Sequence, residues 1–467
     1  MAKNLLLLMP LTTKVMAENI RANNAIVAIA TAQGVSSISI IRVSGDAALG
    51  IAQKVSHLKN IKPRYAHLTS IYNVENHLID QAIMIYFVAP YSFTGEDIVE
   101  FQCHGGMIVA QEILDTILVY GARLAEPGEF SKRAFLNGKI DLSKAEAISK
   151  LIEAKSVDAA KILAKQMKGE LQIFVDESRE SLLRALAYSE VVIDYAEEDI
   201  PADIMQSIVS QLEALSEKIE HIVDASYRRR GLIEGFKVAI IGKPNVGKSS
   251  LLNALLSYDR AIVSDIAGTT RDTIEEQVRI GSHIIRLVDT AGIRDSTDTI
   301  EKIGIERSLS SIEDADVVIA LFDASRPFDK EDKKILELLE KLEDKHIIVA
   351  VNKTDLERLF SLENLVGYEV LEVSAKKSFH RLTERLKLLF DTIGEGEELM
   401  LISTRQIEAV TKSKEAIQAA KIPLREGELE FFSYHLQEAV KAISSISRPY
   451  DSEEILDKMF GEFCLGK

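Results

Sequence analysis

The phosphate-binding sequence at 242–249 constrains the fold of this chain more than any other stretch. An apolar run rich in β-branched residues, 236–241, predicts a buried strand, and a helix-forming run starts after Gly247. The glycines of this G-x-x-x-x-G-K-S sequence let backbone N–H groups wrap a polyphosphate, and the helix adds the positive end of its dipole. Lys248 can reach the β- and γ-phosphates, and the Ser249 hydroxyl can bind Mg²⁺. A chance glycine loop would explain neither the strand before it nor the helix after it.

Length and composition indicate a multidomain globular protein. The chain has 467 residues, 46% of them hydrophobic and 27% charged, and a chain of this length has about three domains as a first expectation. Its apolar runs fall far short of the ~20 residues of a membrane helix. A net charge of −16 argues against non-specific nucleic-acid binding by the whole surface, because phosphate neutralisation needs clustered cations. The basic run 228–230 is either a local patch or a solvated junction.

Cysteine usage and the first residues bear on cellular location. Cys103 and Cys464 are the two cysteines and lie far apart, which argues against a disulfide framework and for a reducing, cytoplasmic compartment. Residues 1–15 faintly resemble a signal peptide, but their apolar run is short and Pro10 interrupts it. We therefore interpret 1–23 as an upstream-start extension or a disordered tail.

Hydrophobic periodicity divides the rest of the chain into an α+β part at 24–140, helical parts at 141–234 and 395–467, and an α/β part at 235–394. The α+β part has strand patterns at 26–32, 37–43, 81–88 and 98–103, and a helix pattern at 107–120. The α/β part has short apolar strands at 283–289, 317–322, 346–351 and 370–373, which predict a parallel sheet. Helical stripes include 148–152, 159–163, 208–222 and 429–443. Because helices flank the α/β part on both sides, we expect it to be inserted into one helical domain.

Three further segments indicate that the nucleotide is GTP. Asp289-Thr290-Ala291-Gly292 ends a strand, where the aspartate suits the second shell of Mg²⁺ and the Gly292 N–H can meet the γ-phosphate. Asn352-Lys353-Thr354-Asp355 ends another strand. Its Asp355 carboxylate matches the N1–H and amine donors of guanine, and adenine would leave it unpaired. Ser374-Ala375-Lys376 supplies backbone contacts to the base.

The segment 264–272 lies between the phosphate loop and the Asp289 strand. Its threonines can supply a hydroxyl to Mg²⁺ beside the γ-phosphate, in a loop that orders with GTP and relaxes after hydrolysis. The residue after Gly292 is Ile293, where a Ras-like enzyme has a water-orienting glutamine. Another group must therefore orient the water, and a cation must offset the charge of the transition state.

These motifs support a family resemblance. The sequences at 245–250 and 267–272 look like those of the bacterial translation-associated GTPases as a group. The flanking sequences 92–97, 103–106 and 127–142 resemble the amino-terminal domain of the MnmE (TrmE) family of tRNA wobble-uridine modification GTPases, and the Cys-Leu-Gly-Lys ending is similar to that family's ending. The resemblance covers nearly the whole chain from Asn24 on.

The resemblance implies a multidomain architecture and a reaction. The architecture is a tetrahydrofolate-binding α+β domain (24–140), a discontinuous all-α helical domain (141–234 and 395–467), and an inserted α/β P-loop, Ras-like GTPase domain (235–394). The family implies a homodimer that forms a heterotetramer with a flavin-dependent partner of the MnmG (GidA) family. Together they add a carboxymethylaminomethyl or aminomethyl group to C5 of the wobble uridine of certain tRNAs. The implied cofactors are GTP, Mg²⁺, K⁺ and a 5-formyl- or 5,10-methylene-tetrahydrofolate.

Site residues carry over from the family motifs position by position. Glu301 matches a water-orienting glutamate, Lys248 a phosphate-binding catalytic lysine, and Cys464 a terminal cysteine that is either a reactive thiol or a structural residue. Cations suit the folate glutamate tail and a carboxylate suits pterin N–H donors; the matching folate positions are Arg42, Glu100, Lys139 and Lys467. The Mg²⁺ positions are Ser249 and Thr270, and the K⁺ positions are Asn245, Ser264, Ile266 and Thr269. The GTP-binding positions are Asn245, Val246, Gly247, Lys248, Ser249, Ser250, Ser264, Asp265, Ile266, Ala267, Gly268, Thr269, Thr270, Asp289, Thr290, Ala291, Gly292, Asn352, Lys353, Asp355, Ser374, Ala375 and Lys376.

The chain departs from the family pattern in two places, and its sequence also leaves alternative interpretations of the site residues and of the function. The family has several glycines before the Arg42 strand where this chain has the run 32–39, and Ser264 stands where threonine is common. For Arg42, Glu100 and Lys139 a surface ion pair is the alternative interpretation, and for Glu301 it is an acidic first turn of a helix. The competing functions are a ribosome-assembly GTPase switch without one-carbon chemistry and a free-standing folate aminomethyl-transfer enzyme.

Overall fold

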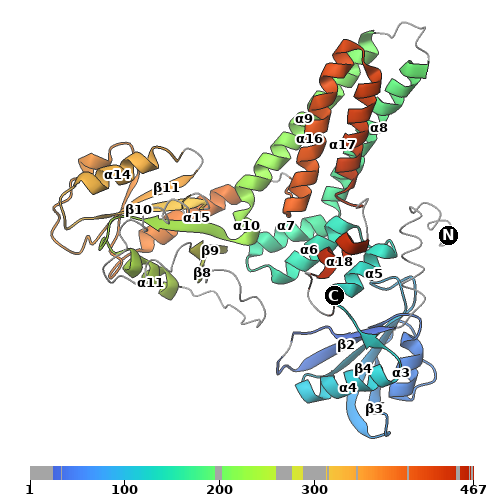
Figure 1. Cartoon of the computed structure of the whole chain (residues 1–467). Helices are drawn as coiled ribbons and strands as arrows, with labels where there is room; N and C mark the ends of the chain where they lie inside the picture. Colours follow the sequence, from blue (N-terminus) through green and yellow to red (C-terminus); the bar gives the residue numbers. More distant parts are fainter. Residues whose placement is uncertain are drawn as a thin grey trace. The chain divides into compact units, whose positions relative to one another are not determined.

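The structure, a computed structural model, describes residues 25–32, 34–194, 202–258, 276–287, 312, 315–342, 345–396, 399–448, 453–461, 463 and 466. The chain divides into two compact units (Figure 1). The first consists of 1–149, 172–180 and 440–467, and the second of 150–171 and 181–439. Each unit contains one six-stranded sheet.

The sheet of the first unit is antiparallel except for one pair. Its strands are β1 (Ile26–Ile29), β2 (Ile38–Ser44), β3 (His67–Tyr72), β4 (Leu78–Phe87), β5 (Ile98–His104) and β6 (Arg123–Leu124). They follow the order β3-β4-β5-β2-β1-β6, with β1 and β6 parallel. Helices α3 (Ala48–Ser56) and α4 (Met107–Val119) share a core with alternate strand residues, including Val43, Met84 and Phe101. Because side chains alternate along a strand, Arg42 and Glu100 point to the opposite face.

The predicted strands of this unit are confirmed, with two differences. The strand expected at 26–32 ends at Ile29. Ala30 N still donates to the Ile40 carbonyl at 2.7 Å, and then the Thr31 hydroxyl accepts a hydrogen bond from Ile40 N. Strands β3 and β6 were not predicted, and the helix expected at 107–120 is α4. The unit also contains α5 (Glu129–Leu136) and α18 (Glu453–Gly461), which pack together around Leu456 and Phe460.

The second unit contains the predicted parallel sheet. Its strands are β7 (Phe236–Ile241), β8 (Glu276–Ile280), β9 (His283–Leu287), β10 (Val317–Asp323), β11 (His346–Asn352) and β12 (Val370–Glu372). Their order is β12-β11-β10-β7-β9-β8, and all neighbours are parallel except β8 and β9. Every residue of β10 is buried, since separate apolar clusters cover the two faces of the sheet. The accompanying helices are α11 (Lys248–Tyr258), α14 (Lys330–Leu339), η2 (Leu362–Leu365) and α15 (His380–Gly394).

Helices form most of the other described residues. They are α6 (Leu142–Glu153), α7 (Val157–Met167), α8 (Glu170–Asp194), α9 (Ala202–Arg229), the short α10 (Gly231–Glu234), α16 (Thr404–Glu426) and α17 (Leu429–Ser444). The stripe predicted at 208–222 is buried, and α9 packs along α16. The stripe at 148–152 is only partly correct, because Ile152 is 43% exposed. Among the described helices, none has the length and apolar character needed to cross a membrane.

Candidate functional site

The phosphate loop follows β7 in a conformation that only glycine tolerates at two positions. Gly242 has φ +155°, and a Cβ there would lie 2.4 Å from the Leu321 carbonyl oxygen. Gly247 has φ +102°, and a Cβ there would lie 2.3 Å from Asn352 Nδ2. Both contacts are shorter than any real Cβ contact, so the loop is drawn tightly against the neighbouring strand ends. This close backbone approach is what a polyphosphate cradle requires.

Lys248 begins α11 and turns its ammonium back into the loop. Its Nζ donates to the carbonyl oxygens of Gly242 at 2.8 Å and Lys243 at 2.9 Å. Burial lowers the pKa of Lys248 from its usual value because the charged form is poorly solvated there. An anion at the helix N-terminus would restore that lost solvation. The loop therefore fits a polyphosphate in both shape and charge.

Residues of the Asn-Lys-Thr-Asp segment hold the loop in place. Asn352 Nδ2 donates to the Val246 carbonyl at 2.8 Å, and its Oδ1 accepts from Ala375 N at 2.9 Å. Lys353 Nζ donates to the Asn245 carbonyl at 2.7 Å and to Asp323 Oδ2 at 2.6 Å. The phosphate loop, the end of β11 and the segment 374–376 therefore meet at the carboxyl ends of parallel strands, where open α/β sheets bind ligands.

Asp355 is arranged to remain ionised. The Ser374 hydroxyl donates to its Oδ1 at 2.8 Å, and Lys377 lies 3.8 Å from its Oδ2. The hydrogen bond from Ser374, followed by weaker contributions that include the charges of Lys377 and Lys376, holds the pKa of Asp355 below its usual value. An ionised carboxylate beside Ala375 suits the paired N–H donors of guanine.

Many predicted site residues lie outside the described part of the chain. In the nucleotide site these are Ser264, Asp265, Ile266, Ala267, Gly268, Thr269, Thr270, Asp289, Thr290, Ala291, Gly292 and Glu301. Cys464 and Lys467 also lie outside it. Within the described residues, no group of three or more His, Cys, Asp or Glu side chains could hold a metal ion. Of the two predicted Mg²⁺ positions, Ser249 is described and lies in the first turn of α11, and Thr270 lies outside the described residues.

In the first unit, three of the four predicted folate positions are described, and Arg42 and Lys139 contact or approach the loop between β4 and β5. Arg42 pairs with Glu100 at 2.9 Å across the β2–β5 register, and its guanidinium lies 5.9 Å from the ring centroid of Phe93. Lys139 Nζ donates to the Pro90 carbonyl at 2.9 Å. The structure thus brings Arg42, Glu100 and Lys139 into one region, although the first two already form the ion pair that was the alternative interpretation.

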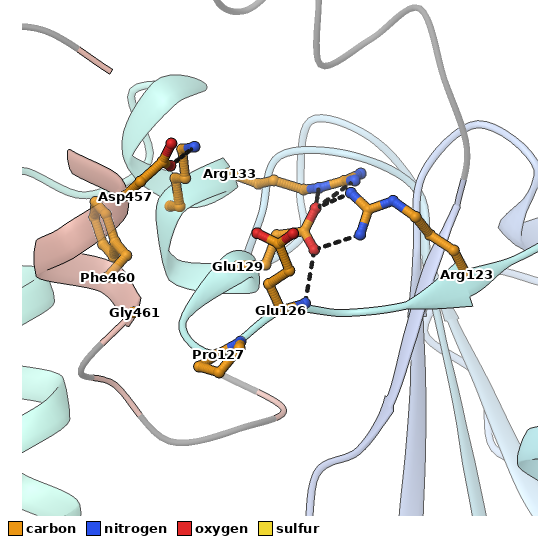
Figure 2. Close-up of a pocket in the computed structure, with 9 residues that line it drawn as sticks. Arg123, Glu126, Pro127, Glu129, Arg133, Asp457, Phe460 and Gly461 are labelled. Carbon is orange, nitrogen blue, oxygen red and sulfur yellow. Dashed lines mark hydrogen bonds and ion pairs between the residues drawn. The ribbon is translucent and has the colours of Figure 1, made fainter. Parts of the chain in front are cut away.

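A neighbouring charged pocket of about 230 Å³ is lined by Arg123, Glu126, Pro127, Glu129, Lys132, Arg133, Asp457, Phe460 and Gly461 (Figure 2). Glu129 accepts from Arg123 at 2.5 and 2.8 Å and from Arg133 at 2.9 Å, and Arg133 also pairs with Glu96 at 3.1 Å. Lys132 pairs with Asp457. Burial opposes the charge of Glu129, but its hydrogen bonds, led by Arg123, hold its pKa below the usual value. The cations of this pocket therefore already have carboxylate partners, and the network stabilises the start of α5.

Cys103 is a buried thiol in the core of the first unit. It is 2% exposed, and burial followed by the charge of Asp80 raises its pKa to about 11. At neutral pH this thiol is protonated and unreactive. Cys103 is therefore a structural residue.

Two described residues with a part in the site were not predicted. Asp323 ends β10 and receives Lys353, and Lys243, the second residue of the phosphate loop, reaches two carboxylates of α14. Motif matching gives no signal for Lys243, because its partners lie 86 and 89 residues away.

The phosphate loop lies between β7 and α11, and hydrogen bonds of Asn352 connect it to the segment 374–376, which is predicted to contact guanine. This arrangement defines the class of P-loop nucleotide-binding proteins. A family model described as the MnmE helical domain matches residues 142–464, and one described as the GTP-binding protein TrmE N-terminus matches residues 25–139. The chain belongs to the MnmE family, which confirms the resemblance expected from the motifs.

Individual relatives agree with this membership. The chain is 80% identical to the tRNA modification GTPase MnmE of Sulfurovum sp. (strain NBC37-1), over 96% of this chain and 99% of that protein. It is 59% identical to the protein of the same name from Aliarcobacter butzleri, over 95% of this chain and 99% of that protein. A crystal structure of Era with MgGDPNP and a 16S ribosomal RNA segment is 31% identical over 39% of this chain and 66% of that chain, with a TM-score of 0.26. A TM-score this low defines neither fold nor function.

Proposed function

We propose that this protein is a GTP hydrolase that acts in tRNA modification. The observation that carries the proposal is the phosphate loop braced by Asn352 and Lys353 beside the ionised Asp355, in a chain that belongs to the MnmE family. The loop supplies backbone donors and Lys248 to the phosphates, while Asp355 selects guanine. The relatives are named as tRNA modification GTPases. We assign the same substrate class to this chain because it is 50–80% identical to them over nearly the full length.

The hydrolytic step needs groups that replace the missing glutamine. We infer that Glu301 orients the attacking water. Mg²⁺ and K⁺, when bound, would supply positive charge to the developing charge on the phosphoryl oxygens. Ser249 and Thr270 would hold Mg²⁺, and the K⁺ ligands would be Asn245, Ser264, Ile266 and Thr269. Among the K⁺ ligands, Asn245 belongs to the described residues. Its backbone has φ +65°, and its carbonyl oxygen accepts a hydrogen bond from Lys353 Nζ, so its position in the loop is well defined.

The first unit would bind the one-carbon donor. We propose that Arg42, Glu100, Lys139 and Lys467 bind a tetrahydrofolate derivative and that Cys464 acts near the modified uridine. The donor set supports this assignment: the three cations suit the glutamate tail and the one carboxylate suits the pterin. Folate binding would then open the Arg42–Glu100 ion pair, at a cost that its 22% and 15% side-chain exposures keep moderate.

Assembly and location complete the proposal. The protein would act as a homodimer, with a flavin-dependent partner of the MnmG family in a heterotetramer. GTP hydrolysis would drive association of the GTPase domains and control the modification of wobble uridine C5. A tRNA substrate and the cysteine content of the chain fit the cytoplasm.

The hydrolysis is tested by steady-state GTPase assays in K⁺ and in Na⁺. We expect faster hydrolysis in K⁺, and we expect Glu301→Ala to reduce kcat far more than it weakens binding of a GTP analogue. Equal rates in the two salts would contradict the role of K⁺. Equal losses of kcat and affinity would contradict the role of Glu301.

The folate site is tested by calorimetry with 5-formyltetrahydrofolate. We expect wild-type protein to bind it and Lys139→Ala to bind it more weakly, whereas Lys59→Ala, an exposed lysine of the same unit, keeps wild-type affinity. A silent titration at high protein concentration, together with co-sedimentation with ribosomes, would favour the ribosome-assembly switch instead.

A further inference from the structure

The side chain of Lys243 pairs with two carboxylates outside the phosphate loop. It is 7% exposed, and its Nζ lies 2.7 Å from Asp329 Oδ2 and 2.7 Å from Asp332 Oδ2. Burial opposes its charge, but the hydrogen bonds to both aspartates raise the pKa of Lys243 above its usual value. At neutral pH it is therefore an ammonium ion held by two carboxylates.

The two carboxylates are fixed by the first turn of α14. Asp329 Oδ1 accepts from the backbone N–H groups of Glu331 and Asp332 at 2.8 and 3.2 Å, and Asp332 Oδ2 accepts from Asp329 N at 3.1 Å. This reciprocal arrangement is a capping box, which determines where both side chains point. Lys243 is thus attached to the start of α14 through two carboxylates that backbone hydrogen bonds hold in place, with side-chain exposures of 52% for Asp329 and 2% for Asp332.

The backbone of Lys243 faces the phosphate-binding lysine. Its carbonyl oxygen accepts from Lys248 Nζ at 2.9 Å, beside the Gly242 carbonyl. Asn352 and Lys353 hold the loop at Val246 and Asn245. Lys243 holds the earlier half of the loop, which carries the two carbonyl groups that orient the Lys248 ammonium.

Charge balance gives the same contact a second effect. Asp329 and Asp332 place two negative charges next to a loop that binds a polyphosphate, and the Asp332 side chain is only 2% exposed. The ammonium of Lys243 offsets part of this charge, which would otherwise repel the phosphates. We therefore expect Lys243 to contribute more to nucleotide binding than an ion pair on an exposed surface contributes to stability.

We propose that Lys243 is a positioning residue for nucleotide binding. It anchors the first half of the phosphate loop to the start of α14, and through its carbonyl group it sets the position of the Lys248 ammonium. The inference rests on the proposed GTPase function. It adds a residue that contacts neither the base nor, through its side chain, the phosphates.

The test compares nucleotide affinity in Lys243→Met, Lys243→Arg and wild-type protein, with fluorescent GDP and GTP analogues. Because both nucleotides use the same loop, we expect Lys243→Met to weaken both by on the order of tenfold, with a larger change in KM than in kcat. Lys243→Arg keeps the charge and both partners, so it should recover most of the affinity. Lys333→Met removes a lysine of α14 whose side chain is 71% exposed, and it should bind like wild type.

A second variant separates positioning from folding. Lys243→Met leaves Asp332 buried without its cation, which destabilises the domain. The triple variant Lys243→Met, Asp329→Asn, Asp332→Asn removes those charges, so it should regain thermal stability relative to Lys243→Met while nucleotide binding stays weak. Wild-type affinity in either the single or the triple variant would overturn the inference. Absence of GTP hydrolysis by the wild-type protein would instead contradict the proposed function.

Discussion

Glu129 shows that a residue of a family motif can stabilise the fold without contacting a ligand. It lies in the segment 127–142 that carries the resemblance, and its carboxylate receives Arg123, Arg133 and the backbone N–H of Glu126. These contacts join β6 to α5 beside the region of Arg42. Such a motif would therefore serve to hold β6 and α5 together as much as to contact a ligand.

The depressed pKa of Glu129 predicts a pH dependence of stability. A carboxyl group whose folded pKa lies below its unfolded value stabilises the protein fully above the unfolded pKa, and this contribution is lost as the pH falls through the folded pKa. We expect Glu129→Gln to destabilise the first unit at pH 7 by about 2–4 kcal/mol, because the buried Arg133 guanidinium and the more exposed Arg123 guanidinium both lose a charged partner. The difference from wild type should shrink below about pH 4.5, where the unfolded carboxyl group is protonated.

Scanning calorimetry of the full-length protein between pH 7 and pH 3.5 measures this difference. Glu75→Gln is the matched control, since the Glu75 side chain is 78% exposed. A gap between wild type and Glu129→Gln that stays constant or widens on acidification would show that the carboxylate is not the stabilising species.

At the scale of elements, the phosphate loop depends on how closely it approaches the end of β11. We expect Gly247→Ala to abolish GTP binding, because the new Cβ would lie 2.3 Å from Asn352 Nδ2 and displace the side chain that holds the Val246 carbonyl. Gly367→Ala is a matched control with φ +98° and nothing within 4 Å of its Cβ. It carries the same backbone strain, of about 1 kcal/mol, without the collision.

Equilibrium titration with a fluorescent GTP analogue distinguishes these two variants. Near wild-type binding by Gly367→Ala and loss of binding by Gly247→Ala is the expected result. Equal losses in both variants would mean that backbone strain, and not the approach to Asn352, limits the loop.

Elements were predictable from the sequence where burial is complete or motifs are dense. β10 is a continuous apolar run because helices cover both faces of its sheet, and 242–249 fixes the strand, turn and helix together. β8 was missed because its sequence Glu-Gln-Val-Arg-Ile carries charges at a sheet edge, and β3 because it alternates in a short mixed run. Pairing across long sequence separations, such as Arg42 with Glu100 or Lys243 with Asp329, leaves no local pattern and needs the folded chain.

At the scale of the whole molecule, the contacts concern the two points where the chain passes between the long helices and the GTPase segment. These two points lie side by side. Arg229 Nη2 donates to the Gly394 and Gly396 carbonyl groups at 3.3 and 3.1 Å, and Leu401 N donates to Ser226 Oγ at 2.9 Å. Since α9 packs along α16, the chain leaves and returns at neighbouring points. We infer that the α/β segment is an insertion, and we expect α9 and α16 to pair without it.

Excision of the segment tests this arrangement. We expect a chain in which a short Gly-Ser linker replaces 236–393 to keep the helical content of its remaining residues and to bind 5-formyltetrahydrofolate as the full chain does. Circular dichroism and calorimetry measure the two properties. Loss of helical structure would show that α9 and α16 depend on the GTPase segment. Retained helices without folate affinity would mean that the folate site needs that segment.

The central claim, that this chain couples a guanine-nucleotide site to the modification of wobble uridine, is tested most directly by mass spectrometry of tRNA nucleosides. Cells that lack the protein should contain tRNAs with wobble uridines that have no aminomethyl-type substituent at C5. Expression of the wild-type chain should restore the substituent, and expression of Lys248→Ala should not. Unchanged wobble nucleosides in the deleted cells, or full restoration by Lys248→Ala, would contradict the account.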